Sequence, residues 1–125
     1  MAVIADVTLR APNSVLLLGD PQGLPPESMR GRVVANSRSC IAVGTISEAD
    51  GEAHIRLAVP PNGSPHSHPE ILGFEGSVEL PNRLFVVSSV QGDTYAVLPV
   101  NAQSVRVRIW LDDATEPREI YVFVE

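Results

Sequence analysis

Two histidines separated by one residue are the groups in this sequence best suited to chemistry. His66 and His68 flank Ser67, and Pro69 follows them. In an extended backbone, residues two apart point to the same side, and the proline favours that geometry for His68. Imidazole is the commonest ligand for zinc, copper and iron, so the pair could chelate one such ion. His54, the remaining histidine, could complete a site that keeps one position open.

The same histidines also fit a solvated loop, because the stretch 60–69 is rich in proline and serine. Ligand identity without a further partner at a defined distance is weak support for a metal. The leading expectation is therefore that the protein holds no metal and no other cofactor. His66, His68 and His54 remain the metal-ligand candidates of an alternative interpretation.

Other catalytic groupings find less support in the sequence. Ser88 and Ser89 lack the flanking glycines of a nucleophile elbow. Asp112 and Asp113 lie in a stretch where aspartates typically initiate a turn. Cys40 is the single cysteine, which excludes an internal disulfide. We therefore expect a protein that is not an enzyme.

The charge balance of the chain bears on its partners. Fifteen acidic residues face nine basic ones, all of them arginine, for a formal net charge of −6. Nucleic-acid affinity comes from neutralised phosphates, and anionic membranes attract basic segments, so neither is an expected partner. An acidic surface suits a basic protein instead. With no apolar run near the roughly 20 residues of a membrane helix and no basic leader, the expected compartment is the cytoplasm.

Strands are the elements that must position these groups. Eleven prolines and nine glycines leave little room for a long helix. Apolar and polar residues alternate with a period of two, as in 105–111 and 120–124, which is typical of half-buried strands. The predicted strands lie near 2–10, 14–18, 31–35, 39–47, 52–59, 71–80, 83–90, 94–99, 103–111 and 118–124. We therefore predict a single all-β domain, an antiparallel two-sheet β-sandwich of about eight to ten strands over residues 1–125. A small β-barrel is the alternative.

Turn residues predict how the strands connect. Asp50-Gly51 lies between two strand-like runs and predicts a hairpin. Gly73 and Gly76 predict a bulge in the strand that contains them. A short helical turn is expected at 26–29.

Two of the predicted strands carry aromatic and charged side chains on one face. Arg106, Arg108 and Trp110 alternate with apolar residues, and so do Glu119, Tyr121 and Phe123 in the following strand. If the two strands are antiparallel neighbours, arginine lies beside glutamate and the aromatic rings lie together. Either another layer covers this face, or it is open and binds a partner or a second copy.

The order of elements from Val7 onward is similar to that of the competence protein J family, small bacterial proteins that inhibit a partner nuclease. The segments that carry the resemblance are 7–10, 15–18, 74–81, 84–89, 95–99, 105–110 and 120–124. The resemblance implies a β-sandwich without catalytic residues that acts by protein–protein contact.

A shorter resemblance points to a different function. The stretch His66–Leu80 resembles the first cupin motif, in which a His-x-His pair precedes a glutamate and a strand that ends in glycine. Here Glu70 and Glu75 follow His68 by two and seven residues, and no histidine follows His68. The resemblance implies a small metal-binding β-barrel.

The sequence thus favours a protein-binding module, with inhibition of a basic partner such as a nuclease as the concrete form. The acidic candidates for partner contact are Asp112, Asp113, Glu116, Glu119, Glu75 and Glu79. A third interpretation is a structural module that forms homodimers through Arg108, Trp110, Tyr121 and Phe123.

Overall fold

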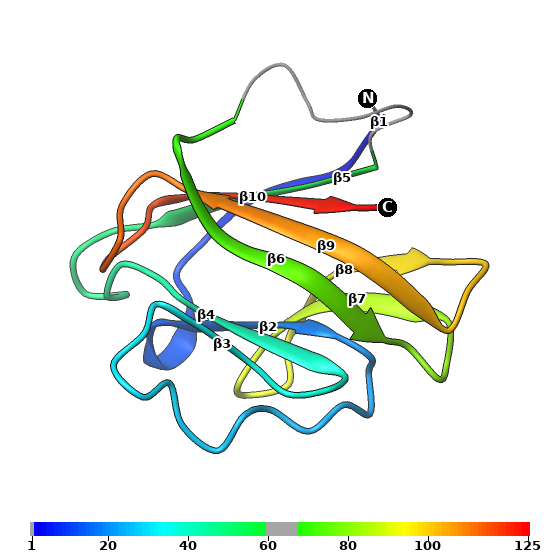
Figure 1. The fold of residues 1–125 in the computed structure, drawn as a ribbon. Coiled ribbons are helices and arrows are strands. Elements are labelled where there is room, and N and C mark those ends of the chain that lie inside the picture. Colours follow the sequence, from blue (N-terminus) through cyan, green and yellow to red (C-terminus); the bar gives the residue numbers. More distant parts are fainter. Residues whose placement is uncertain (1, 60–67) are drawn as a thin grey trace.

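The strands lie in two layers, as the ribbon in Figure 1 shows. The structure is a computed structural model that describes residues 2–59 and 68–125. Its ten strands are β1 (Ala2–Leu9), β2 (Val15–Gly19), β3 (Val34–Asn36), β4 (Cys40–Gly44), β5 (Ala53–Val59), β6 (Ile71–Glu79), β7 (Leu84–Ser89), β8 (Thr94–Pro99), β9 (Ser104–Leu111) and β10 (Glu119–Val124). All ten strands predicted from the alternation are therefore present.

Each layer is a five-stranded sheet. Sheet A has the order β1-β5-β10-β9-β6, and sheet B has the order β3-β4-β2-β7-β8. The predicted two-sheet sandwich is confirmed. The barrel alternative is wrong, because within the described residues each sheet ends in an edge strand and neither closes on itself. The pair β5–β10 is parallel, whereas the other strand pairs are antiparallel.

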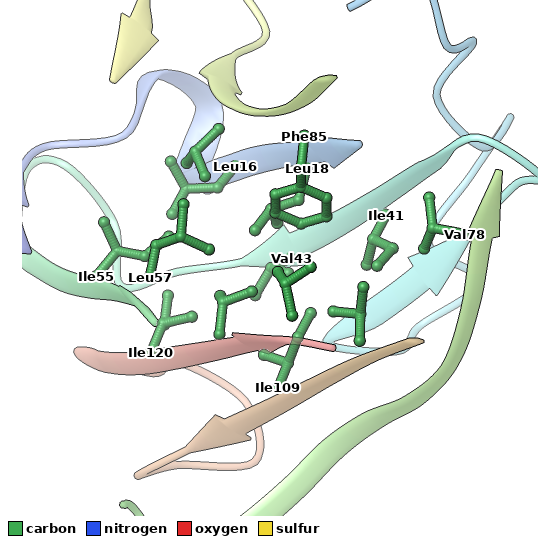
Figure 2. Close-up of a cluster of buried hydrophobic side chains, with 14 of the residues drawn as sticks. Leu16, Leu18, Ile41, Val43, Ile55, Leu57, Val78, Phe85, Ile109 and Ile120 are labelled. Atoms are coloured by element: carbon green, nitrogen blue, oxygen red, sulfur yellow. The ribbon is translucent and has the colours of Figure 1, made fainter. Parts of the chain in front are cut away.

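The core lies between the sheets and is built by the inward half of each alternation. Figure 2 shows Leu16 and Leu18 of β2 facing Ile109 and Ile120 of sheet A. All four of these side chains have no exposed surface. Burying an aliphatic side chain of this size contributes about 1.5–3 kcal/mol, so the alternation itself drives the two sheets together.

Two of the predicted turns are not present in the structure. The hairpin expected at Asp50-Gly51 is wrong, because β4 belongs to sheet B and β5 to sheet A, so residues 45–52 cross between the sheets. The prediction of a helical turn at 26–29 is also wrong, because these residues form no helix. A short 3-10 turn, η1 (Pro12–Ser14), lies elsewhere, between β1 and β2.

The predicted bulge is present at one of its two glycines. The register of β6 against β9 shifts between Leu72 and Phe74, which flank Gly73. A Cβ atom at Gly73 would lie 2.6 Å from Cδ1 of Leu111, so glycine lets the bulged strand approach its neighbour.

Charge is distributed unequally between the sheets. The strands of sheet A contain Asp6, Arg56, Glu75, Glu79, Arg106, Arg108 and Glu119. The strands of sheet B contain no aspartate, glutamate, lysine or arginine within their described bounds. The two outer faces of the sandwich therefore differ in the kinds of molecule that they can contact.

No helix in residues 2–59 or 68–125 has the length and apolar character required to cross a membrane.

Candidate functional site

A row of directly paired residues crosses the outer face of sheet A. It consists of one residue from each strand, in the order Asp6, Arg56, Tyr121, Trp110 and Leu72. We call it the cross-strand row. The prediction that the aromatic residues of the last two strands are neighbours is confirmed, because Trp110 is paired with Tyr121.

Ring contacts connect the members of this row. The guanidinium carbon of Arg56 lies 4.9 Å from the centroid of the Tyr121 ring, and Nη2 donates to Oδ2 of Asp6 at 3.2 Å. The imidazole of His68 stacks on Trp110, with ring centroids 3.8 Å apart and an angle of 23° between the planes. His68 thus covers one face of the indole, and the row is only partly open to a partner.

Phe123 lies in the neighbouring row, opposite Ala58 and Arg108. Its side chain is fully buried although it is on the outer face of the sheet. Arg108 forms an ion pair with Glu125. Of the predicted aromatic contact residues, Trp110 and Tyr121 retain partial exposure and Phe123 does not.

His54 joins three strands of sheet A at the next row. Nδ1 lies 2.6 Å from Oε2 of Glu119 on β10, and Nε2 contacts Oδ1 of Asp6 on β1. A neutral imidazole has only one N–H, so two carboxylate partners favour the doubly protonated imidazolium. Partial burial acts to lower the pKa of His54, but the bonds to Asp6 and Glu119 outweigh it and raise the pKa.

The same cluster acts on the carboxylates. The hydrogen bond from His54 is the main cause that lowers the pKa of Asp6, with further contributions from Arg56. The carboxylate of Glu119, which the sequence offered as an acidic candidate for partner contact, is engaged by His54. This cluster is thus a structural tie between β1, β5 and β10.

The metal-ligand candidates are placed in different surroundings. Both ring nitrogens of His54 face carboxylates, and Nδ1 of His68 lies 2.6 Å from the carbonyl oxygen of Pro69. His66 lies outside the described residues. In the part of the chain that is described, no group of three or more histidine, cysteine or acidic side chains is placed to hold a metal.

Asp112 and Asp113 shape the loop 112–118 between β9 and β10. Oδ1 of Asp113 accepts from the backbone N–H groups of Thr115 at 2.8 Å and Glu116 at 2.9 Å, and these bonds lower its pKa. Oδ1 of Asp112 accepts from the N–H groups of Arg118 at 2.8 Å and Glu119 at 3.0 Å. The turn-initiating role expected for both aspartates is therefore present, and both remain exposed.

This loop lies beside the crossing segment 45–52. The N–H of Ile46 donates to the carbonyl of Pro117 at 3.0 Å, and the N–H of His54 donates to the carbonyl of Arg118 at 2.6 Å. Together the two segments carry six exposed acidic residues and a single arginine: Glu48, Asp50, Glu52, Asp112, Asp113 and Glu116, with Arg118. We call this region the acidic end.

Sequence reasoning found only half of the acidic end. Glu48, Asp50 and Glu52 were not singled out, because the segment that carries them is far from 112–118 along the chain. The remaining predicted acids lie elsewhere: Glu75 is paired with Arg108 across β6 and β9, and Glu79 lies 3.7 Å from Arg38.

Comparison with known proteins supports the fold. No protein-family model and no curated protein matches the chain. The crystal structure of ComJ, inhibitor of the DNA degrading activity of NucA, from Bacillus subtilis, is similar with a TM-score of 0.70 and 9% identity, over 99% of this chain and 97% of that one. A structure described as crocagin biosynthetic gene J is similar with a TM-score of 0.59 and 14% identity, over 99% and 97% of the two chains. At these identities the likeness shows a ComJ-like fold.

Proposed function

We propose that this protein is a non-enzymatic, protein-binding module that inhibits a basic nuclease. The observation that carries the proposal is the likeness in fold to ComJ over nearly the whole length of both chains. ComJ is described as an inhibitor of the DNA-degrading activity of NucA. The net charge of −6 and the acidic end supply the complementary chemistry that a basic partner requires.

The acidic end is suited to this contact for two physical reasons. An enzyme that holds DNA presents basic groups to phosphates, and carboxylates gathered on one surface attract the same groups. The loop 112–118 is also held by hydrogen bonds to Asp112 and Asp113, so less conformational freedom is lost when it docks.

The test is an assay of DNA cleavage by a basic, non-specific nuclease from the same organism, titrated with this protein. Glu52→Gln/Glu116→Gln removes two acids of the acidic end, and Glu27→Gln/Glu70→Gln removes two exposed acids outside it. Both variants change the net charge equally. We expect the first pair to raise the inhibition constant by about tenfold or more, because it removes two charges from the contact, and the second pair to leave it nearly unchanged.

Two results would contradict the proposal. One is DNA cleavage that does not slow at any ratio of this protein to nuclease. The other is an equal loss of inhibition in both double variants, which would mean that overall charge rather than the acidic end is recognised.

A further inference from the structure

A hollow of about 350 Å³ opens at the acidic end. On one side it is lined by Ala114, Thr115 and Glu116 of the loop 112–118, which joins two strands of sheet A. The other sides come from the start of β2, the end of β4 and the residues that precede β3, all strands of sheet B. The hollow therefore lies within the surface that we propose for contact with a nuclease.

The walls of the hollow are largely apolar. Val15, Met29 and Val33 line it, and all three are half-buried. Apolar surface is more stable out of water, so an occupant that covers these side chains gains free energy from apolar contact. A cavity of about 150 Å³ in an apolar environment is known to hold a benzene molecule, so this hollow has room for an aromatic side chain.

The polar groups of the hollow offer little to a charged occupant. The hydroxyl of Thr45 donates to a neighbouring backbone carbonyl, and that of Thr115 donates to Oδ1 of Asp113, both at 2.9 Å. Of the described residues that line the hollow, Glu116 and Arg32 carry charge, with opposite signs. The lining therefore has no net charge, and an uncharged side chain loses the least hydration free energy on entering it.

The rim around the hollow is acidic. Asp113 directly precedes Ala114 of one wall, Glu48 directly follows Ser47 of another, and both acids are exposed. A partner that inserts a side chain here therefore brings its neighbouring surface against carboxylates. That surface must be basic to gain from the approach, which agrees with the net charge of −6 and with the partner proposed above.

Hydrogen bonds between the walls hold the hollow in shape. The N–H of Gly44 donates to the carbonyl of Val33 at 2.7 Å, and the N–H of Thr45 donates to the carbonyl of Ser14 at 2.8 Å. The loop on the remaining side is held by the carboxylate of Asp113, as described above. A hollow that already exists in the free chain loses little conformational entropy when it is filled.

Backbone conformations of the left-handed region border the hollow. In the described part of the chain, four residues other than glycine have a positive φ, and three of them are here: Asn13 (57°), Ser14 (59°) and Arg30 (52°). Ser14 lines the hollow, and Arg30 lies between two residues that do. Such conformations cost free energy in residues with a side chain and are concentrated at sites of binding or catalysis. Their presence here supports a contact role for this end of the fold.

We propose that the hollow receives one uncharged, apolar side chain of the basic nuclease, as large as an aromatic ring, while basic residues around that side chain face the acidic end. This inference rests on the proposed function and names a contact that carboxylates alone do not supply. Protein interfaces typically combine an apolar core with a polar rim, and a large side chain seated in a pocket contributes a major part of the affinity.

The test measures the dissociation constant of the complex with the basic, non-specific nuclease of the same organism by isothermal titration calorimetry. Ala114→Phe places a ring in the hollow and should raise the dissociation constant by about tenfold or more. The matched control is Ala49→Phe, which changes another exposed alanine of the acidic end that does not line the hollow. Neither variant alters the charge, and the control should weaken binding far less.

The ionic strength identifies the chemistry of the occupant. Salt screens the attraction between exposed charges, so the affinity of the natural chain should fall as the salt concentration rises. An apolar contact is not screened in this way. The factor by which Ala114→Phe weakens binding should therefore be the same at low and at high ionic strength.

A second variant changes the wall of the hollow without filling it. Val15→Thr keeps the shape of the side chain but adds a hydroxyl, which should raise the dissociation constant by about threefold or more. Val97→Thr makes the same change on β8, at a valine that is 46% exposed and does not line the hollow, and should have no effect. Circular dichroism of all four variants confirms that they fold.

The outcomes separate this inference from the proposed function. A natural chain without affinity for the nuclease overturns both. Binding that Ala114→Phe and Ala49→Phe weaken equally, or that neither weakens, overturns the hollow contact alone and leaves inhibition standing. So does equal affinity of Val15→Thr and Val97→Thr, and so does a loss on Ala114→Phe that shrinks as salt rises, which would assign a charged side chain to the hollow.

Discussion

At the scale of single residues, the ionisation of His54 makes the stability of the protein dependent on pH. The pKa of His54 is raised by Asp6 and Glu119 against the opposing effect of burial. A group whose folded pKa is raised stabilises the protein fully below its unfolded value of about 6.5 and loses that contribution as the pH passes the folded value. The stability advantage of the natural chain over His54→Gln should therefore decrease as the pH rises through that interval. Urea unfolding of both proteins at a series of pH values measures this difference in the free energy of unfolding.

The cause of this shift can be tested separately. In Glu119→Gln one of the two carboxylates is lost, so the pKa of His54, followed by nuclear magnetic resonance, should fall below that of the natural chain. Glu27→Gln, an exposed acid outside the cluster, is the control and should leave it unchanged. A pKa of His54 that does not respond to Glu119→Gln would contradict the geometry described for the cluster.

Trp110 provides an optical probe of the outer face of sheet A, because it is the single tryptophan of the chain. His68 covers one face of its ring. In His68→Ala that face gains contact with water, so the emission maximum should move to longer wavelength. Losing the stacked pair should also lower the free energy of unfolding by about 0.5–1.5 kcal/mol. An unchanged emission spectrum in the folded variant would show that the two rings do not stack.

At the scale of elements, Gly19 allows the end of β2 to lie close to the backbone just before β4. Its φ is +145°, and a Cβ atom there would lie 2.2 Å from the backbone carbonyl oxygen of Ser39. Gly31 has a φ of +73° but no heavy atom within 4 Å of the same position. We expect Gly31→Ala to cost about 1–2 kcal/mol from backbone strain alone. Gly19→Ala should cost more, by about 1–3 kcal/mol, because backbone must move.

Urea unfolding of the two glycine variants checks this difference. Equal losses of stability would contradict this prediction. They would mean that the backbone of segment 36–39 can move away from an added methyl group at no cost in free energy.

The strands could be predicted from the sequence because each has its own alternation. The prediction near 52–59, for example, matches β5 (Ala53–Val59) closely, whereas the one near 31–35 begins too early and overlaps β3 (Val34–Asn36) only at its first two residues. Alternation identifies which side chains share a face but not which sheet a strand joins. Asp50-Gly51 therefore suggested a hairpin where the chain in fact crosses between the sheets.

The candidate site was predictable only where its residues lie on consecutive strands. The neighbourhood of Trp110 and Tyr121 follows from one hairpin, since β9 and β10 are joined by a short loop. The tie through His54 joins residues from β1, β5 and β10, which no local pattern connects. His68 drew attention as a metal ligand, and its sequence context contained no signal for stacking on an indole.

At the scale of the whole molecule, the strand order predicts slow folding. β5 is paired with β1 on one side and with β10 on the other, so its neighbours come from opposite ends of the described chain. Loops that join such distant segments must close before their contacts stabilise anything. We expect refolding on the order of milliseconds to seconds, followed by the fluorescence of Trp110 in stopped-flow mixing. Refolding within microseconds would contradict this expectation.

The flanking of β5 by β1 and β10 has a practical consequence for work with this protein. Ala2 is paired with Val59 and Phe123 with Ala58, so both ends of the described chain lie near the last residues of β5 (Figure 1). The acidic end lies at the opposite end of the same strand, next to Ala53. An affinity tag or a surface linker on either terminus therefore leaves the acidic carboxylates facing solution. Protein immobilised through its first strand and protein immobilised through its last strand should therefore bind the same partner. Each tagged form can serve as a control for the other.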